Sequence, residues 1–486
     1  MESSEDRSAT PPAAAPASQA DLSATGSSAT GSLAVSPAAG RPAPADSGQH
    51  VLPGNLLPDE VILREEPRNL LMLCLHHIVL RTAWVFKTES VIMPAFLDSI
   101  AGAGWIRGLL PVFNRIGQSG PPLLFADTLR RQPVKSRSLL LTSVSMGFPF
   151  LLLSGLLAWP GSAGEWWLPA AFLLLYFLFF CTTGMNQLAF STVQGRLIRP
   201  HRRGRLMGLA GVVGSVVSIT CAWYLLGLWL DRPDGGFVPI FLFCGCGFVI
   251  AGLCILFVRE PADSGVPRTK SLHRDLLPDA WRLVRNDRDF RRLAIVSMLF
   301  VTGQLLFPHY QALGRGSGQI GRAQLMHWVV AQNASVGVLS LLTGAIADRS
   351  GNRLAVRLAC FGSAITPPVA LLLAGPTGPT GGHPLFWLAF LPLGFMPVTF
   401  RTLTNYVLEL AEPHEHPRYV STLKLCMAVP FLLSPLVGLC VDLLGFVPVF
   451  LAISALMALG GLLTFRLSEP RHAHVVHSTV TEPARD

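Results

Sequence analysis

Three arginines, Arg81, Arg115 and Arg401, lie inside long apolar runs of the sequence. A guanidinium keeps its proton at physiological pH, so an arginine that leaves water needs a negative or hydrogen-bonding partner. At about 1.5 Å of rise per helical residue, Arg81 and Arg115 lie at similar depth and Arg401 slightly further in, with no acid at that depth. An anionic substrate would supply the missing charge. Alternatively, each arginine binds backbone carbonyls or extends its side chain to a water interface.

Glu89, Arg107 and His309 are further ionisable residues within apolar runs. Glu89 and Arg107 lie on the order of 10 Å outward of the middle of their runs, so we expect them to pair. Lys87 is two residues from Glu89 and would face another direction on a helix. Glu89 and His309 are candidates for a group that carries a coupling proton. The alternative for His309 is a bond to a backbone carbonyl that the preceding proline leaves free.

The elements that must position these side chains are helices that cross a membrane. The chain of 486 residues is 50% hydrophobic and 14% charged, against about 25% charged in a soluble domain. About 20 apolar residues are needed to cross the hydrocarbon, and lipid cannot satisfy free backbone groups, so helices are required. Twelve spans are predicted, at residues 69–96, 105–125, 138–158, 167–193, 206–230, 237–258, 293–313, 325–347, 354–374, 385–410, 420–444 and 447–465. The tenth and eleventh are polar enough that we expect a hydropathy profile to blur them.

The distribution of basic residues orients these helices. The breaks after the second and fourth spans are rich in arginine, whereas the breaks at 160–166 and 231–236 hold a single arginine, Arg232. Basic loops stay on the cytoplasmic side of a membrane, so both termini are expected in the cytoplasm. The abundance of Ala, Pro, Gly and Arg suggests a GC-rich, bacterial source and therefore a location in the inner membrane.

The chain is expected to contain two similar halves. Arg68 starts the first span and Arg288 precedes the seventh, an offset of 288 − 68 = 220. Asp127 and Asp348 open equivalent loops, an offset of 348 − 127 = 221. Such a repeat is typical of transporters. The predicted organisation is a disordered N-terminal tail, an N-terminal six-helix half, a cytoplasmic linker, a C-terminal six-helix half and a tail, at residues 1–65, 66–260, 261–290, 291–468 and 469–486.

The loop after the eighth span carries a recognisable pattern, G-x-x-x-D-R-x-G-x-R, formed by Gly344, Asp348, Arg349, Gly351 and Arg353. It resembles the loop motif that joins helices two and three, and helices eight and nine, in the major facilitator superfamily. Glycine permits the tight turn, and an aspartate at a helix end pairs well with arginine. The resemblance implies that these residues latch one conformation of the two halves.

Other stretches are similar to the same family. They are the basic segment at 202–205 and the pattern P-x-x-G-x-x-x-D-x-x-G at 435–445. The first-half loop keeps Asp127 as a latch residue but lacks Arg and Gly at their expected places. The resemblance covers about residues 65–468 and implies an all-α membrane protein with twelve transmembrane helices in two pseudo-symmetric six-helix bundles. These bundles would rock about one central site, whose substrate the fold does not name.

In that family, helices one, four, seven and ten line the central site. The resemblance therefore adds four polar residues to the three arginines as candidate substrate-binding residues: Asn186, Gln187, Gln304 and Asn405. Hydrogen bonds that only pack neighbouring helices explain these side chains equally well.

Several classes of function are disfavoured. The sequence has no phosphate-binding loop, nucleophile elbow or HExxH motif, which argues against an enzyme and against an ATP-driven pump. Its nine cysteines lie in apolar runs, which implies neither disulfides nor a metal site. The tail residues His472, His474 and His477 are interpreted as solvated, so no metal or cofactor is expected.

The predicted function is secondary active transport of a small solute by alternating access, with an organic anion favoured and proton coupling as an option. The alternative is a transport-inactive or regulatory membrane protein of the same fold. The expected partners are a small-molecule substrate and the lipid bilayer, without nucleic acid, and the chain is expected to act as a monomer.

Overall fold

The computed structural model describes residues 58–161, 164–232, 235–262, 276–315, 323–375, 385–412 and 415–469. These residues belong to one compact unit, Leu56–Asp486, and are built from helices, with no strand among them. Residues 1–57, within the predicted N-terminal tail, and 263–275, within the predicted linker, lie outside the described residues. The tail histidines His472, His474 and His477 do so as well.

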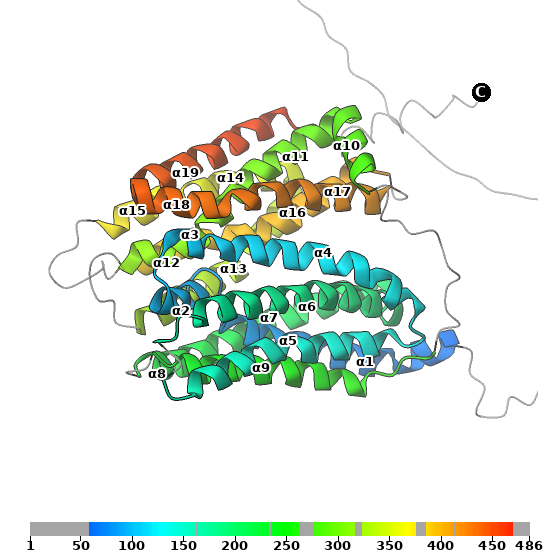
Figure 1. Cartoon of the computed structure of the whole chain (residues 1–486). Coiled ribbons are helices and arrows are strands. Elements are labelled where there is room, and N and C mark those ends of the chain that lie inside the picture. Colours follow the sequence, from blue (N-terminus) through cyan, green and yellow to red (C-terminus); the bar gives the residue numbers. More distant parts are fainter. Residues whose placement is uncertain are drawn as a thin grey trace, which may run out of the picture. The chain divides into compact units, whose positions relative to one another are not determined.

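The N-terminal half crosses the bundle six times, and several crossings consist of more than one helix (Figure 1). The first helix begins at Pro58, inside the stretch expected as the tail. The elements are α1 (Pro58–Val85), α2 (Ile92–Ile100), α3 (Gly104–Arg107), α4 (Leu109–Arg131), α5 (Lys135–Ala158), α6 (Leu168–Leu197), α7 (Pro200–Cys221), η2 (Ala222–Leu226), α8 (Gly227–Leu230), α9 (Phe237–Cys254) and η3 (Ile255–Phe257).

The C-terminal half repeats this pattern after a short connecting helix, α10 (Leu276–Asn286). Its elements are α11 (Arg288–Val301), η4 (Thr302–Leu306), α12 (Phe307–Arg315), α13 (Ala323–Ser350), α14 (Asn352–Ala364), α15 (Thr366–Ala374), η5 (Phe386–Phe390), η6 (Pro392–Gly394), α16 (Phe395–Leu410), α17 (His416–Ala428), η7 (Val429–Leu433), α18 (Ser434–Leu444), α19 (Phe446–Leu463) and η8 (Thr464–Arg466).

Ten described segments are long and apolar enough to cross a membrane, and they correspond to the third to twelfth predicted spans. The first span (α1 and α2) and the second (α3 and α4) are not among them. Their long helices carry Arg81 in α1 and Arg115 in α4, whereas Glu89 lies between α1 and α2 and Arg107 lies in the short α3. The tenth and eleventh spans, which were expected to be blurred, are both among the ten, although the tenth has the lowest mean hydropathy of them, 1.3.

The first crossing is interrupted where one continuous helix was expected. α1 ends at Val85, turns follow, and α2 begins at Ile92. Pro94 near the start of α2 has no N–H to donate to the residue four before it, which favours a break at this point. The seventh crossing is distorted at the corresponding place, where the 3-10 segment η4 joins α11 to α12.

Each half has its own packed interior. In the N-terminal half α5 packs against α6 and α9, and α1 packs against α7 and α9. Phe96 of α2 contacts Phe172 and Phe241 edge-to-face, with ring centroids 5.1 and 5.0 Å apart. In the C-terminal half α14 packs against α16 and α19, and α11 packs against α19. The halves meet at a seam between α3 and α4 on one side and α17, η7 and α18 on the other, and also where α13 contacts α7, η2 and α8.

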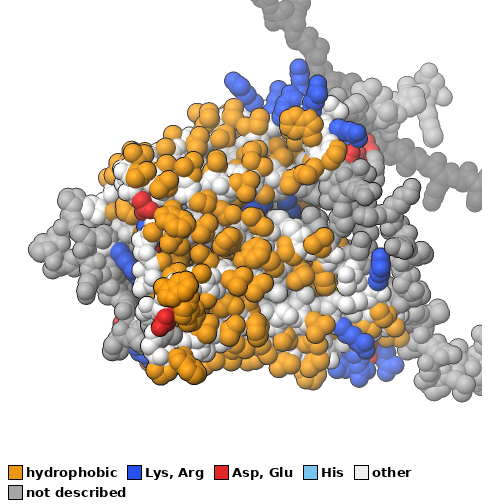
Figure 2. Space-filling model, in the orientation of Figure 1, with side chains coloured by type: hydrophobic (Ala, Val, Ile, Leu, Met, Phe, Trp, Pro, Cys, Tyr) orange, Lys and Arg blue, Asp and Glu red, His pale blue; other side chains and the backbone are white. Residues whose placement is uncertain are grey.

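The two ends of the bundle differ. One end, here called the basic end, carries Arg131, Arg199, Arg202, Arg259 and Arg353. The other, the α3 end, contains α2, α3, α8 and α12 (Figure 1). At the α3 end the halves contact each other through α3 and α18, α2 and α12, and α8 and α13. Figure 2 shows a broad hydrophobic face, with basic side chains gathered mainly near α10 and the start of α1. Such a face suits a lipid environment.

Candidate substrate site

A cavity of about 610 Å³ lies between the two halves. Its walls come from α1 and the turn after it, α4 and α6 on one side, and from η4, α12, α13, α16 and η7 on the other. The volume is within the range that accommodates a drug-sized molecule. Because both halves supply the walls, any relative motion of the halves changes the shape of this cavity.

Arg81, Arg115 and Arg401 all lie on the wall of this cavity. Arg81 and Arg401 come from opposite halves, and their charges are close enough to repel each other. Arg115 donates from Nη2 to the backbone oxygen of Lys424 at 3.1 Å, and its guanidinium lies 5.4 Å from the ring centroid of Phe431. Within the described chain, the buried Nε atoms of Arg81 and Arg115 have no hydrogen-bond partner. Arg81 and Arg115 thus bring positive charge to the wall, and each keeps a buried donor without a partner in the described chain.

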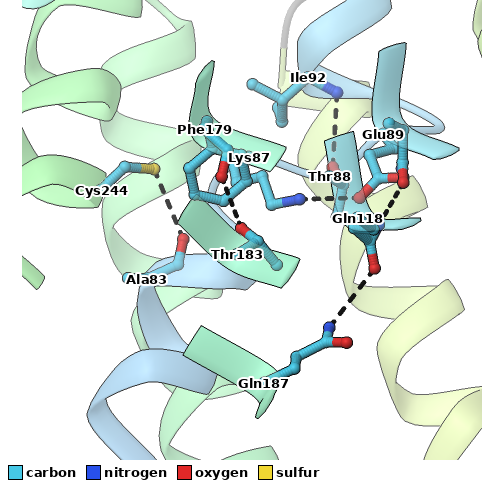
Figure 3. Close-up of polar contacts among 11 residues, drawn as sticks. Ala83, Lys87, Thr88, Glu89, Ile92, Gln118, Phe179, Thr183, Gln187 and Cys244 are labelled. Atoms are coloured by element: carbon cyan, nitrogen blue, oxygen red, sulfur yellow. Dashed lines mark hydrogen bonds and ion pairs between the residues drawn. The ribbon is translucent and has the colours of Figure 1, made fainter. Parts of the chain in front are cut away.

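Glu89 is the acid on the same wall, and it begins a chain of polar contacts. Its Oε1 is 2.7 Å from Lys87 Nζ, and its Oε2 accepts a hydrogen bond from Asn114. Gln118 donates to Asn114, and Gln187 donates to Gln118 Oε1 at 3.4 Å. Figure 3 follows Lys87, Glu89, Gln118 and Gln187 along this chain. The carboxylate thus connects the turn after α1 to α4 and α6.

The ion pair with Lys87 corrects a sequence expectation. Lys87 was expected to face away from Glu89, but that geometry applies only within a helix, and both residues lie in the turns that follow α1. Lys87 is fully buried, with Nζ 3.2 Å from the ring centroid of Trp84. The rings of Phe179 and Phe180 lie 4.9 and 4.6 Å away. Aromatic faces and Glu89 together stabilise this buried charge.

The expected pair of Glu89 with Arg107 is also wrong. Arg107 Nη1 lies 3.3 Å from Asp98 Oδ2, and Nη2 lies 3.9 Å from Asp442 Oδ1 across the seam. Asp442 also accepts hydrogen bonds from the backbone nitrogens of Gly104 and Trp105, at 2.9 and 3.1 Å. A carboxylate from α18 thereby caps the start of α3. The break after α1 directs Glu89 into the cavity, away from these residues.

The remaining candidates divide between cavity and packing positions. Gln187 and Gln304 line the cavity, whereas Asn186 and Asn405 are not among its lining residues. Asn186 is buried and donates to Ser143 Oγ at 2.7 Å on α5, which is the packing role left open from the sequence. Asn405 is exposed on α16. His309 is fully buried in α12, and neither ring nitrogen has a partner among the described residues.

Sequence reasoning missed several wall residues. Asn114 and Gln118 are four apart on α4, a spacing that places two polar side chains on one helix face. Gln332 of α13 accepts a hydrogen bond from Ser90 Oγ at 2.5 Å, which joins the two halves at the cavity. These residues lie on the second and eighth crossings, which the family resemblance did not mark as lining. Their polarity within apolar spans was the available signal.

The loop motif lies at the basic end, between α13 and α14. Gly351 has φ of 86°, and a Cβ there would meet Glu469 Oε1 at 2.6 Å. Arg353 donates from Nη1 to the backbone oxygen of Leu467 at 3.1 Å, and its Nε lies 3.9 Å from Glu469 Oε2. These contacts tie the α13–α14 turn to the end of the twelfth crossing.

Three other motif residues, Gly344, Asp348 and Arg349, are exposed near the end of α13. Asp127 lies in α4, but its side chain is outside the described atoms. The structure therefore locates Gly351 and Arg353 in a defined contact and leaves the latch role of the motif as a prediction.

The N-terminal half has a matching arrangement at the basic end. Glu260 accepts hydrogen bonds from the backbone nitrogen of Ser136 at 2.6 Å and from Arg196 Nη1 at 3.0 Å. Glu260-Pro261 and Glu469-Pro470 follow the last crossing of each half, an offset of 469 − 260 = 209. The two glutamates thus connect the last crossing of each half to the start of its third.

Glu66 forms a second ionic contact at this end, outside the predicted first span. Its carboxylate lies 2.7 Å from Arg199 Nη2 and 3.2 Å from Arg202 Nη1. Burial raises the pKa of Glu66, but the hydrogen bonds and charges of the two arginines outweigh that effect and hold the pKa below its ordinary value.

Comparison with known proteins identifies the class. The sequence pattern of the Major Facilitator Superfamily matches residues 124–318 and 308–483, so the chain belongs to this family. It is therefore a secondary transporter rather than an enzyme and a multi-pass protein of the membrane, and the predicted twelve-helix fold is confirmed. A search of curated proteins gave no match.

Solved structures with the same fold include three transporters. The nucleoside transporter NupG, in a mutant form, gives a TM-score of 0.64 at 12% identity over 82% of this chain and 99% of its own. The peptide transporter POT in complex with sulfate gives 0.62 at 13% identity, over 83% and 96%. The E. coli fucose:proton symporter FucP gives 0.53 at 16% identity, over 83% and 100%. At these identities the likeness concerns the fold alone.

Proposed function

We propose that this chain transports an organic anion by alternating access, with the anion bound between Arg81, Arg115 and Arg401. The observation that carries the proposal is the pair of buried Nε donors, on Arg81 and Arg115, without an acceptor in the described chain. A buried charged donor left unpaired costs free energy, and an anion would satisfy it. The acid on the wall, Glu89, is already paired with Lys87 and so leaves the wall with net positive charge.

In this proposal the structure corresponds to the state that faces the cytoplasm. The bias of basic loops assigns the basic end to the cytoplasm and the α3 end to the outside. The halves meet at the α3 end, so a substrate in the cavity would exchange with the cytoplasmic side. Both termini would be cytoplasmic, and the chain would act as a monomer in a bacterial inner membrane.

Glu89 is the proposed proton carrier. It lies on the cavity wall and holds Lys87 and Asn114 at the same time. A proton on Glu89 would remove its attraction for Lys87 and change the net charge that a bound anion meets, which links proton and anion binding. His309 is the second candidate, and it would need the α3 end to open before water reaches its buried ring.

The loop residues are proposed to set the balance between the two conformations. Arg353 and Gly351 fix the α13–α14 turn against Glu469, and Gly344, Asp348, Arg349 and Asp127 would complete the latch between the halves. Loss of the latch would shift the equilibrium toward the conformation in which the halves make fewer contacts at the basic end.

Uptake into proteoliposomes tests the proposal. Labelled organic anions, neutral solutes and cations are offered with and without an inward proton gradient, to the natural chain and to Arg81→Ala and Arg115→Ala. Anions are expected to accumulate, and each substitution is expected to lower the initial rate about tenfold or more, the effect of one charged hydrogen bond. Arg282→Ala, at an exposed arginine of α10, is the matched control and should transport normally.

Two other outcomes of the uptake experiment would contradict the proposal. Transport of neutral or cationic solutes that ignores the arginine substitutions would make these arginines structural and overturn the proposed anion site. If no solute of a broad panel moves under any gradient, the regulatory alternative is favoured instead.

A further inference from the structure

A second hollow of about 260 Å³ adjoins the central cavity between α4 and the segment formed by α17 and η7. It shares Arg115 and Phe431 with the cavity, so the two spaces meet at these two residues. Apart from Arg115 and Ser119, the residues that line it are apolar or glycine. They include Val112, Ile116, Gly120, Leu425, Val429 and Leu432.

The outer side of this hollow lies at the hydrophobic surface of the bundle. Ile116, Val429 and Leu432 are 45, 51 and 63% exposed. Figure 2 shows basic side chains within the seam between the two halves, on a face that is otherwise hydrophobic. A positive charge that reaches a lipid-facing seam is unusual, because an unpaired charge in hydrocarbon is costly.

A third hollow, of about 380 Å³, continues along the same face between α4 and α6. Six residues line it: Phe113, Ile116, Ala170, Leu173, Leu174 and Phe177. It shares Ile116 with the second hollow. The three spaces therefore adjoin one another in series. The third hollow is wholly apolar, the second hollow is mainly apolar, and the central cavity carries three arginines.

We infer that this seam is a lateral binding site for an anionic lipid, whose head lies on Arg115 and whose acyl chain lies in the apolar hollows. The inference rests on the proposed anion site and names the class of anion: an amphiphile that enters from the bilayer. Lys424 contributes a second positive charge beside Arg115. The gradation from apolar to basic surface matches such a molecule, since an anion without a chain would gain nothing from the two apolar hollows.

Photolabelling of the full-length chain in phosphatidylcholine nanodiscs tests the inference. The probe is palmitate with a diazirine in its chain, and labelled peptides are mapped by mass spectrometry. Labels are expected on 112–120 and 425–432. Lysophosphatidylglycerol should compete, whereas zwitterionic lysophosphatidylcholine and glycerol 3-phosphate, which has an anionic head without a chain, should not.

Substitutions locate the site. Arg115→Ala is expected to lower labelling of these segments about tenfold, as the loss of one charged hydrogen bond does. Gly120→Trp should lower it similarly by filling the hollow, because a Cβ at Gly120 has open space around it. Leu341→Trp, at an exposed position of α13, is the control and should label as the natural chain does.

Two results would overturn the inference: labels spread evenly around the lipid-facing surface, or labels on this seam that neither substitution changes. Competition by glycerol 3-phosphate would also contradict it and identify the ligand as a water-soluble anion. Labelling does not require transport. Seam labelling that depends on Arg115 therefore supports the lipid site even if no anion is taken up. Absence of anion uptake would refute the proposed transport but not the lipid site.

Discussion

Lys87 and Glu89 form an ion pair with 2.7 Å between Nζ and Oε1, yet Glu89 lies on the cavity wall and Lys87 is fully buried behind it. The pair exists because the first crossing breaks after Val85, so two residues that would diverge on a helix meet in a turn. A buried cation and a solvent-accessible acid are thereby coupled. Any change in the charge of Glu89 is felt by a lysine that has no access to water.

Lys87→Met is expected to destabilise the folded protein by about 2 kcal/mol, because it leaves Glu89 without its counter-charge. The effect is smaller than for a wholly buried pair, since Glu89 is 25% exposed. Adding Glu89→Gln should recover part of the loss. Thermal unfolding in detergent of both single variants and the double variant measures the coupling, and strictly additive effects would contradict it.

Two neighbouring residues of α6 are expected to behave differently. Asn186→Ala should lower the free energy of unfolding by about 1–2 kcal/mol, because it removes buried hydrogen bonds to α5. Gln187→Ala should leave stability nearly unchanged and slow uptake, because Gln187 lines the cavity. Unfolding midpoints and uptake per folded molecule are measured for both. A stable Asn186→Ala that cannot transport would instead assign Asn186 to the substrate.

The two glycines of the loop motif are also expected to differ. Gly351→Ala should cost about 1–3 kcal/mol, since Gly351 has φ of 86° and an added Cβ would meet Glu469. Gly344→Ala should be neutral or slightly stabilising, because an added Cβ meets nothing within 4 Å in this helix. Unfolding midpoints of the two variants test this directly, and equal losses would contradict the prediction.

Stability should depend on pH through Glu66. Its pKa is lowered in the folded state, so its contribution is complete above the ordinary value of 4.5 and is lost as the pH falls through the lowered pKa. Glu66→Gln is therefore expected to be less stable than the natural chain by about 1–2 kcal/mol at pH 7. Unfolding midpoints measured between neutral and acidic pH should converge below pH 4.5, and a constant difference would argue against this assignment.

The twelve crossings could be predicted because hydrophobic length is a local property of the sequence. The break after Val85 is also encoded locally: Pro94 marks it, but the apolar run from 69 to 96 concealed it. Because residues 69–96 were treated as one continuous helix, Lys87 was predicted to face away from Glu89 and Arg107 was predicted to pair with it. Both predictions were wrong. An error of one turn in helix continuity changes every side-chain direction after it.

The cavity could be predicted only in part. Arg81, Arg115 and Arg401 were found because charges in apolar spans are conspicuous. Gln332 and Asn114 were not predicted to line the cavity, because an uncharged amide within a span often serves only to pack helices. Which helix face lines the cavity depends on how the two halves contact each other. The link between Glu469 and the α13–α14 turn joins residues more than one hundred positions apart, and no local pattern encodes that distance.

The seam at the α3 end is closed by backbone against backbone. A Cβ on Gly438 would collide with the backbone oxygen of Gly104, and one on Gly108 would lie 2.5 Å from the oxygen of Ser434. Flexible side chains can follow a partner as it withdraws, by changing rotamer, whereas two main chains cannot. Separation of α3 from α18 by even a small distance therefore ends this main-chain contact, whereas the side chains of Arg107 and Asp442 can follow each other. This main-chain contact is therefore either intact or lost, unlike the side-chain contacts around it.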